Sequence, residues 1–143
     1  MTLAGPAVAT SEPVNLRNPV PIVLVVDDDP AITMALQLLF ELHGMSAEVA
    51  RSPADTIDRV SRGGLRLVVH DMNFSRADTT GADGLALFRT LRRLAPRLPV
   101  ILITSWPQAD MSARVLREGA AAYLAKPWDD EQLVALASGL TRG

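Results

Sequence analysis

The stretch PIVLVVDDDP, residues 21–30, sets the pattern on which the fold is built. Its first part, residues 21–27, is a continuous and mostly β-branched apolar run, which is typical of a buried strand in a parallel sheet. Pro30 suits the first turn of a helix, and Asp28 or Asp29 suits the cap position before it. The stretch therefore predicts a strand, an acidic turn and a helix in direct succession.

The same order of an apolar run, a polar turn and a helix recurs along the chain. Further strands are expected at 47–50, 65–71, 100–104 and 121–125, and helices at 30–43, 53–62, 83–95, 107–118 and 129–140. Strands that alternate with helices imply a parallel sheet that is covered on both faces. We therefore expect an α/β fold, a doubly wound, three-layer (βα)5 domain around a five-stranded parallel sheet.

The composition limits the classes of protein to consider. The chain has 143 residues, of which 48% are hydrophobic and 21% charged, which suits one globular domain at 20–143. Residues 1–19 show no strand or helix pattern and no signal-peptide pattern, so we expect a flexible tail. The net charge of −2 without a basic block argues against nucleic-acid binding. No apolar run is long enough to span a membrane, and the absence of cysteine fits the cytoplasm.

Polar side chains follow four of the predicted strands, and the carboxyl ends of parallel strands meet at one edge of a sheet. The acidic run 27–29, Asp71, Thr104 and Lys126 should therefore converge there. Neighbouring carboxylates repel each other, and a hard divalent cation such as Mg²⁺ relieves that repulsion. Taken alone, the acidic run could equally be a helix cap without a metal.

A carboxylate in such surroundings can act as a nucleophile. An aspartate that attacks phosphorus forms an acyl phosphate, and cations must neutralise the oxygens of the transferred group. Lys126 and a metal would supply that charge to a group on Asp71, and Thr104 would supply a hydrogen bond. Each residue by itself has an ordinary structural interpretation, so the hypothesis depends on the order and strand-end placement of all of them.

On the motifs at 25–30, 68–71, 101–105 and 123–127, the chain resembles the receiver domain of bacterial two-component response regulators over roughly residues 21–140. The resemblance implies a flavodoxin-like fold and a phosphoryl group donated by a sensor histidine kinase or a phosphotransfer protein. It also implies one role for each matching residue. These are phosphoacceptor and metal ligand (Asp71), direct Mg²⁺ ligand (Asp28), water-mediated ligand (Asp27), ligand through the backbone carbonyl (Asn73), phosphoryl partner (Lys126), switch hydroxyl (Thr104) and switch aromatic (Tyr123).

The resemblance further implies how the signal would leave the domain. Such a domain catalyses only its own phosphorylation and dephosphorylation, so we do not expect an enzyme, and Mn²⁺ could replace Mg²⁺. The surface of residues 107–140 would control an output, such as transcription, or form a homodimer. The chain is either a stand-alone receiver or the regulatory part of a longer regulator. Its motifs at 71–74 and 126–129 resemble receivers of transcription activators with an ATPase and a DNA-binding domain.

Two features depart from the family pattern. The loop 74–83 is long, and it is either a tolerated insertion or a flap that restricts donors and water. His70 stands where receivers have an apolar residue, and we expect it to be a hydrogen-bonded core residue. Trp106 and Trp128 each follow a site residue by two positions and are expected to border the crevice.

Two other functions compete with this interpretation. A Mg²⁺-dependent phosphatase with an aspartyl nucleophile would need a second acid two residues after Asp71, where Asn73 stands. A flavodoxin-like nucleotide-binding protein would need a glycine-rich loop in place of residues 27–30. The acidic run there repels phosphate unless a metal intervenes.

Overall fold

The computed structural model describes residues 20–74 and 79–142, in which five strands alternate with five helices. The expected tail at 1–19 and part of the long loop, 75–78, lie outside the described residues. The strands are β1 (Ile22–Val26), β2 (Ser46–Ala50), β3 (Leu67–Asp71), β4 (Val100–Thr104) and β5 (Ala122–Ala125). The helices are α1 (Pro30–Leu42), α2 (Pro53–Ser61), α3 (Ala82–Leu94), α4 (Ala109–Arg117) and α5 (Asp130–Thr141).

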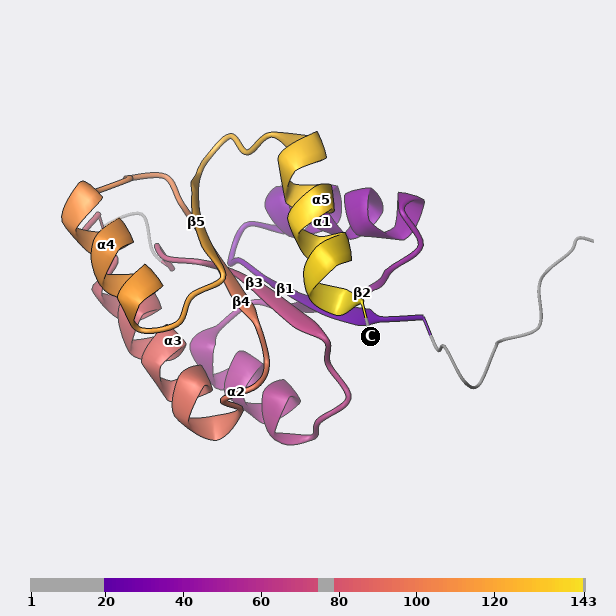
Figure 1. The fold of residues 1–143 in the computed structure, drawn as a ribbon, viewed down its shortest axis with the longest axis horizontal. Coiled ribbons are helices and arrows are strands. Elements are labelled where there is room, and N and C mark those ends of the chain that lie inside the picture. Colours follow the sequence, from indigo (N-terminus) through magenta and orange to yellow (C-terminus); the bar gives the residue numbers. More distant parts are fainter. Residues whose placement is uncertain (1–19, 75–78, 143) are drawn as a thin grey trace, which may run out of the picture.

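All strand pairs are parallel, and the strand order is β2-β1-β3-β4-β5. Helices α1 and α5 cover one face of the sheet, and α2, α3 and α4 cover the other (Figure 1). This is the expected flavodoxin-like, doubly wound (βα)5 fold with three layers. The chain leaves β1 toward β2 and returns to β3 on the other side of β1. The carboxyl ends of β1 and β3 are therefore the switch point at which such folds open a crevice.

Two hydrophobic layers hold the sheet between the helices. Side chains of a strand alternate between the two faces, so Val23 and Val25 pack in the layer under α1 and α5, while Leu24 and Val26 pack in the layer under α2 and α3. Every residue of β3 and β4 is buried. These central strands leave only their ends open to polar chemistry.

The observed elements differ from the expected ones mainly at their ends. β1 is shorter at both ends than the predicted 21–27, β3 begins two residues later than predicted, and α4 is shorter than 107–118. In the connection before α4 the backbone N–H groups bond to side chains instead of continuing a helix. Trp106 N donates to Thr104 Oγ1 at 3.0 Å, and Gln108 N donates to Tyr123 Oη at 3.2 Å.

A glycine permits the close approach of α3 to the end of β3. A Cβ at Gly84 would lie 2.6 Å from the carbonyl oxygen of Met72 and would also meet the Cα of that residue. Helix α3 begins at Ala82, just before the predicted start, and follows Gly81 in the left-handed region at φ 80°. The first turn of α3 therefore rests directly on the backbone that follows Asp71.

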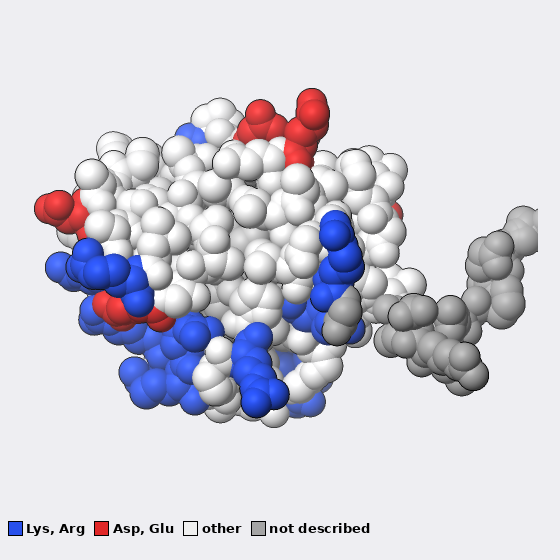
Figure 2. All heavy atoms as spheres, viewed as in Figure 1, with Lys and Arg blue, Asp and Glu red and all other residues white. Residues whose placement is uncertain are grey.

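Charge is unevenly distributed over the folded chain. Lys and Arg side chains gather in the lower half of the view in Figure 2, over α2 and α3 and beside the end of α5. Asp and Glu side chains stand mostly at the top, by the start of α5, and at the left end of the view. Among the described residues, no helix is long and apolar enough to cross a membrane.

Candidate functional site

A pocket of about 570 Å³ opens at the carboxyl edge of the sheet, where β1, β3 and β5 end. It brings together most of the residues that the sequence singled out. Its lining consists of Asp27, Asp28, Asp29, Pro30, Asp71, Asn73, Ser105, Trp106 and Lys126.

Three carboxylates form the acidic side of this pocket. One oxygen each of Asp27, Asp28 and Asp71 lies within 4.8 Å of the others. Asp27 is buried and held on both sides, because its Oδ1 accepts from Asp29 N at 2.9 Å and its Oδ2 accepts from Lys126 Nζ at 2.8 Å. Asp28 is exposed to solvent and stands at the mouth of the pocket.

Asp71 lies at the base of the pocket with 3% of its surface exposed. Its buried Oδ1 accepts no hydrogen bond from the described residues and lies 3.3 Å from Lys126 Nζ. Burial, together with the charge of Asp27, raises the pKa of Asp71 to about 6, although the Asn73 N–H and Lys126 oppose the shift. Asp71 lines the pocket, and its Oδ1 retains acceptor capacity that the described residues do not use.

Lys126 is the one cation that contacts the described carboxylates of this pocket. It follows β5 directly, and the bond to Pro127 is cis. Burial opposes its charge, but the ion pairs with Asp27 and Asp71 raise the pKa of Lys126. One ammonium group cannot neutralise three carboxylates, and burial and Asp27 also raise the pKa of Asp28. An oxygen-only donor set with excess negative charge fits a hard divalent cation such as Mg²⁺ or Mn²⁺.

Thr104 lies beneath the pocket rather than in its lining, with 1% of its surface exposed. Its hydroxyl donates to Asn73 Oδ1 at 2.9 Å, and Ser105 N donates to the same amide oxygen at 3.3 Å. The side chain of Asn73 therefore links the end of β3 to the end of β4. The sequence did not predict this link, because nothing in the spacing of the two residues marks it.

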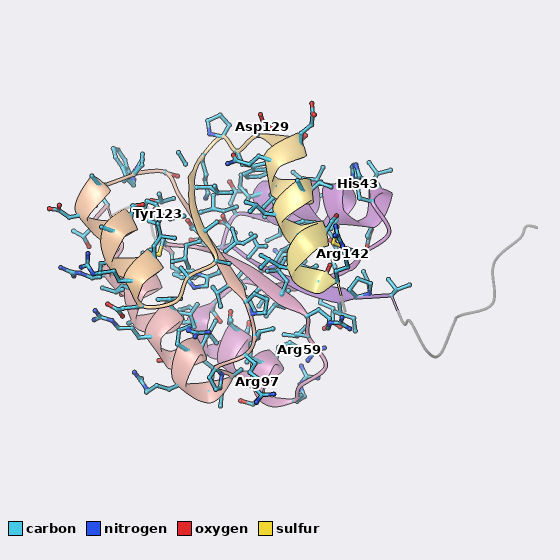
Figure 3. The ribbon with its side chains drawn as sticks, in the orientation of Figure 1. His43, Arg59, Arg97, Tyr123, Asp129 and Arg142 are labelled. Carbon is cyan, nitrogen blue, oxygen red and sulfur yellow. The ribbon has the colours of Figure 1, made fainter. Side chains whose placement is uncertain are left out.

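Tyr123 is not brought into the pocket. It is half-buried on β5 and lies beside α4 (Figure 3), where its hydroxyl oxygen accepts the hydrogen bond from Gln108 N. The side-chain amide of Gln108 also donates to the carbonyl oxygens of Thr79 and Thr80, both at 3.4 Å. Gln108 thus joins the described end of the long loop to the residue expected to be the switch aromatic.

His70 is a buried core residue, as expected. Its Nδ1 lies 2.8 Å from the carbonyl oxygen of Asp71, and its ring stacks on Phe74 with 6.2 Å between the centroids. Burial lowers the pKa of His70 to about 4, so the neutral ring donates its Nδ1 proton to that carbonyl. In the described part of the chain, its Nε2 has no hydrogen-bond partner.

The two tryptophans differ in position. Trp106 lines the pocket and is 52% exposed, as predicted. The prediction for Trp128 is wrong. It packs against the hydrophobic layer under α1 and α5, and its indole N–H donates to Asp130 at 2.8 Å. Trp128 is therefore not among the residues that line the acidic pocket.

Comparison with known proteins agrees with this geometry. The family model described as "Response regulator receiver domain" matches residues 23–138. The C4-dicarboxylate transport transcriptional regulatory protein DctD of Rhizobium meliloti is 32% identical over 114 residues, which cover 80% of this chain and 24% of DctD. The chain therefore spans about a quarter of the length of this relative.

Solved structures share the fold. A response regulator receiver domain protein from Clostridium thermocellum superposes with a TM-score of 0.76 at 22% identity, covering 85% of this chain and 94% of that one. A beryllofluoride-activated NtrC4 receiver domain dimer superposes with a TM-score of 0.75 at 23% identity, covering 84% and 95%. Fold, acidic pocket and family model agree, and the chain belongs to the response regulator receiver domain family.

Proposed function

We propose that Asp71 accepts a phosphoryl group from a phosphohistidine of a sensor kinase or a phosphotransfer protein. The observation that carries the proposal is the pocket itself. Buried Asp71 Oδ1 accepts no hydrogen bond from the described residues and lies 3.3 Å from Lys126 Nζ. One oxygen of Asp71 also lies within 4.8 Å of an oxygen of Asp27 and of Asp28. A nucleophile, a cation and a set of metal ligands are thus combined in one crevice.

The reaction follows from these positions. A carboxylate oxygen of Asp71 forms a bond to phosphorus while the bond from phosphorus to the donor's imidazole nitrogen breaks, and that nitrogen keeps the electron pair. Lys126 already lies beside the attacking carboxylate, where its charge stabilises the phosphoryl oxygens. Above pH 6 the acceptor is mostly ionised, as a nucleophile must be, because its pKa is about 6.

The residues that would hold the metal are Asp28, Asp71 and the backbone carbonyl of Asn73, with Asp27 acting through water. When bound, Mg²⁺ supplies positive charge against the oxygens of the transferred group. The chain's own groups orient the site. Asp29 N–H and Lys126 fix the carboxylate of Asp27, and burial keeps bulk water from Asp71.

Mass spectrometry tests this assignment. We expect that incubation with acetyl phosphate and Mg²⁺ adds one phosphoryl group to the chain, and that Asp71→Asn prevents the addition. Asp58→Asn is the matched control, because Asp58 is exposed on α2 outside the pocket and its variant should react normally. Phosphorylation of the Asp71→Asn variant at the normal rate would contradict the assignment.

A second assay, in which phosphoesters are added, distinguishes a receiver from a phosphatase. The side chain of Asn73 cannot take or give a proton as a second carboxylate would, and its oxygen accepts from Thr104 and Ser105. We therefore expect no turnover of added phosphoesters. Repeated hydrolysis of such esters, lost in Asp71→Asn, would favour the phosphatase instead.

We further propose that the modification is transmitted through Thr104 and Tyr123. The hydroxyl of Thr104 would leave Asn73 for the new phosphoryl oxygens, and Tyr123 would turn inward and lose the hydrogen bond from Gln108. The surface of α4, β5 and α5 would then change. Leu116 on α4 is 47% exposed and offers an apolar contact there. A solved relative carries the description of a beryllofluoride-activated receiver dimer.

Light scattering tests this step. Beryllofluoride, which mimics the phosphoryl group, should shift the chain toward a dimer, and Leu116→Glu should prevent the shift without preventing phosphorylation. If the Leu116→Glu variant dimerises normally, the dimer interface lies on another surface. The proposed output is control of transcription by a longer cytoplasmic regulator, because the curated relative is a transcriptional regulatory protein about four times as long as the match.

A further inference from the structure

A second pocket lies at the opposite, amino edge of the sheet. It is formed by the end of α5 and by the connections that lead into β3 and β4, and its volume is about 270 Å³. Three of its lining residues are arginines and four are apolar, and no carboxylate is among the described residues that line it. They are Arg66, Arg97, Arg142, Leu65, Leu98, Pro99 and Leu140.

These arginines lack the carboxylate partners that Arg59, Arg62 and Arg89 have. Arg59, for example, donates to Glu48 at 2.6 Å. In the described part of the chain, no carboxylate lies within 4.0 Å of Arg66, Arg97 or Arg142. Positive charges from three separate segments are thus placed around one hollow, and no carboxylate of the described residues lies between them. Their repulsion is relieved when an anion enters.

One of the three guanidinium groups is already fixed in place. Arg66 Nη2 donates to the carbonyl oxygen of Thr141 in the last turn of α5 at 2.8 Å. That bond orients the planar guanidinium while its other N–H groups remain for a ligand. A guanidinium fork matches the oxygens of phosphate or carboxylate in pairs. Arg97 and Arg142, which are labelled in Figure 3, are exposed and come from two separate segments, so they can approach a ligand from two sides.

We propose that this pocket binds the phosphate ester of a small apolar group. A phosphate monoester carries close to two negative charges, which suits three cations better than a single carboxylate does. The four apolar residues offer contacts to the rest of the ligand, and a hollow of this volume holds only a small one. An extended nucleic acid would instead suit a flat or grooved basic surface. The inference is independent of phosphorylation at Asp71.

Phenyl phosphate is a suitable probe, titrated into the chain without Mg²⁺ and followed by NMR and calorimetry. We expect the amide signals of Leu98 and Leu140 to shift and those of Asp28 and Asp71 to stay. Phenyl phosphate should bind more tightly than inorganic phosphate, because only the former reaches the apolar residues. Arg97→Gln or Arg142→Gln should each weaken its binding by about tenfold, as expected for a lost hydrogen bond to a charged group.

Arg114→Gln is the matched control, because it removes the same charge from an exposed position on α4 outside the pocket. Both test positions are exposed, so the variants should fold, and thermal melting checks this. The proposal is overturned by the absence of binding, or by an equal weakening in the Arg114→Gln variant. It is also overturned if a short DNA duplex shifts the same amides while phenyl phosphate does not.

Discussion

The two edges of the sheet carry opposite arrangements of charge. At the carboxyl edge, Lys126 lies between Asp27 and Asp71, so unlike charges hold one another at 2.8 and 3.3 Å. At the amino edge, three arginines surround a hollow and have no carboxylate partner among the described residues. Ion pairs within the chain hold the side chains of the first edge, whereas the arginines of the second edge have no such pairs among the described residues. A reactive pocket can thus consist of charges that are already paired with one another, whereas a pocket of unpaired charges of one sign has the properties of a binding site.

The largest expected effect comes from removing the cation of the carboxyl edge. Lys126→Met should slow phosphorylation from acetyl phosphate by about a thousandfold, the upper end of what the loss of one stabilising group costs in a transition state. The rate of acyl phosphate formation measures it. Arg142→Gln removes a cation from the other edge and should leave that rate unchanged. Equal slowing in both variants would mean that overall charge, and not position, governs the reaction.

The pH dependence of the stability of the fold distinguishes the contributions of two buried groups at the carboxyl edge, His70 and Asp71. The pKa of His70 is lowered to about 4, so the unfolded chain binds more protons than the folded chain below pH 6.5. His70 therefore makes the chain less stable as the pH falls, by about 3 kcal/mol between pH 6.5 and pH 4. The pKa of Asp71 is raised to about 6, so the folded chain binds more protons between pH 6 and pH 3.8 and stability rises as pH falls. The two effects oppose each other in the unmodified chain.

Single substitutions should therefore reveal opposite slopes. In urea unfolding with a chelator, Asp71→Asn should lose stability on going from pH 6.5 to pH 4, because only the His70 effect remains. His70→Leu should gain stability over the same interval. Parallel curves for the two variants would show that these groups do not dominate the pH dependence of this edge.

Alanine substitutions at two glycines allow the packing near the two edges to be compared. A Cβ at Gly84 would meet the backbone of Met72, so Gly84→Ala should cost about 2 kcal/mol, a usual value for an overpacked site. Gly139 in α5 has nothing within 4 Å of such a Cβ, and Gly139→Ala should add up to about 1 kcal/mol of stability. Denaturant unfolding measures both. If Gly84→Ala left the free energy of unfolding unchanged, the segment after Asp71 would be able to move aside without loss of stability.

The smallest expected effect is a change in tryptophan fluorescence, which tests which of the two tryptophans borders the acidic pocket. Addition of Mg²⁺ should change the fluorescence of Trp106, which lines the pocket, more than that of Trp128, which does not. Trp106→Phe should therefore abolish most of the response, while Trp128→Phe should keep it. The reverse result would place the ion nearer to α5 than the proposed ligands allow.

Much of the fold and of the acidic pocket could be predicted from the sequence. The site residues of that pocket stand at the end of a strand or within two residues of it, as Asp71 ends β3 and Lys126 follows β5, so a pattern within a few residues reveals their place. The position of Trp128 could not be predicted in this way. Its distance from Lys126 in the sequence matches that of Trp106 from Thr104, but its ring packs against the hydrophobic layer and its N–H donates to Asp130.

The alternation of apolar runs and helices thus determined the α/β fold and the edge at which the carboxylates meet, because both depend on short-range order along the chain. Only the tertiary structure decided which side chains pair. The hydrogen bond from Thr104 to Asn73 and the meeting of Arg66, Arg97 and Arg142 join segments that are far apart in sequence. Such contacts depend on where loops and helix ends come to lie in space, and no local spacing encodes that placement.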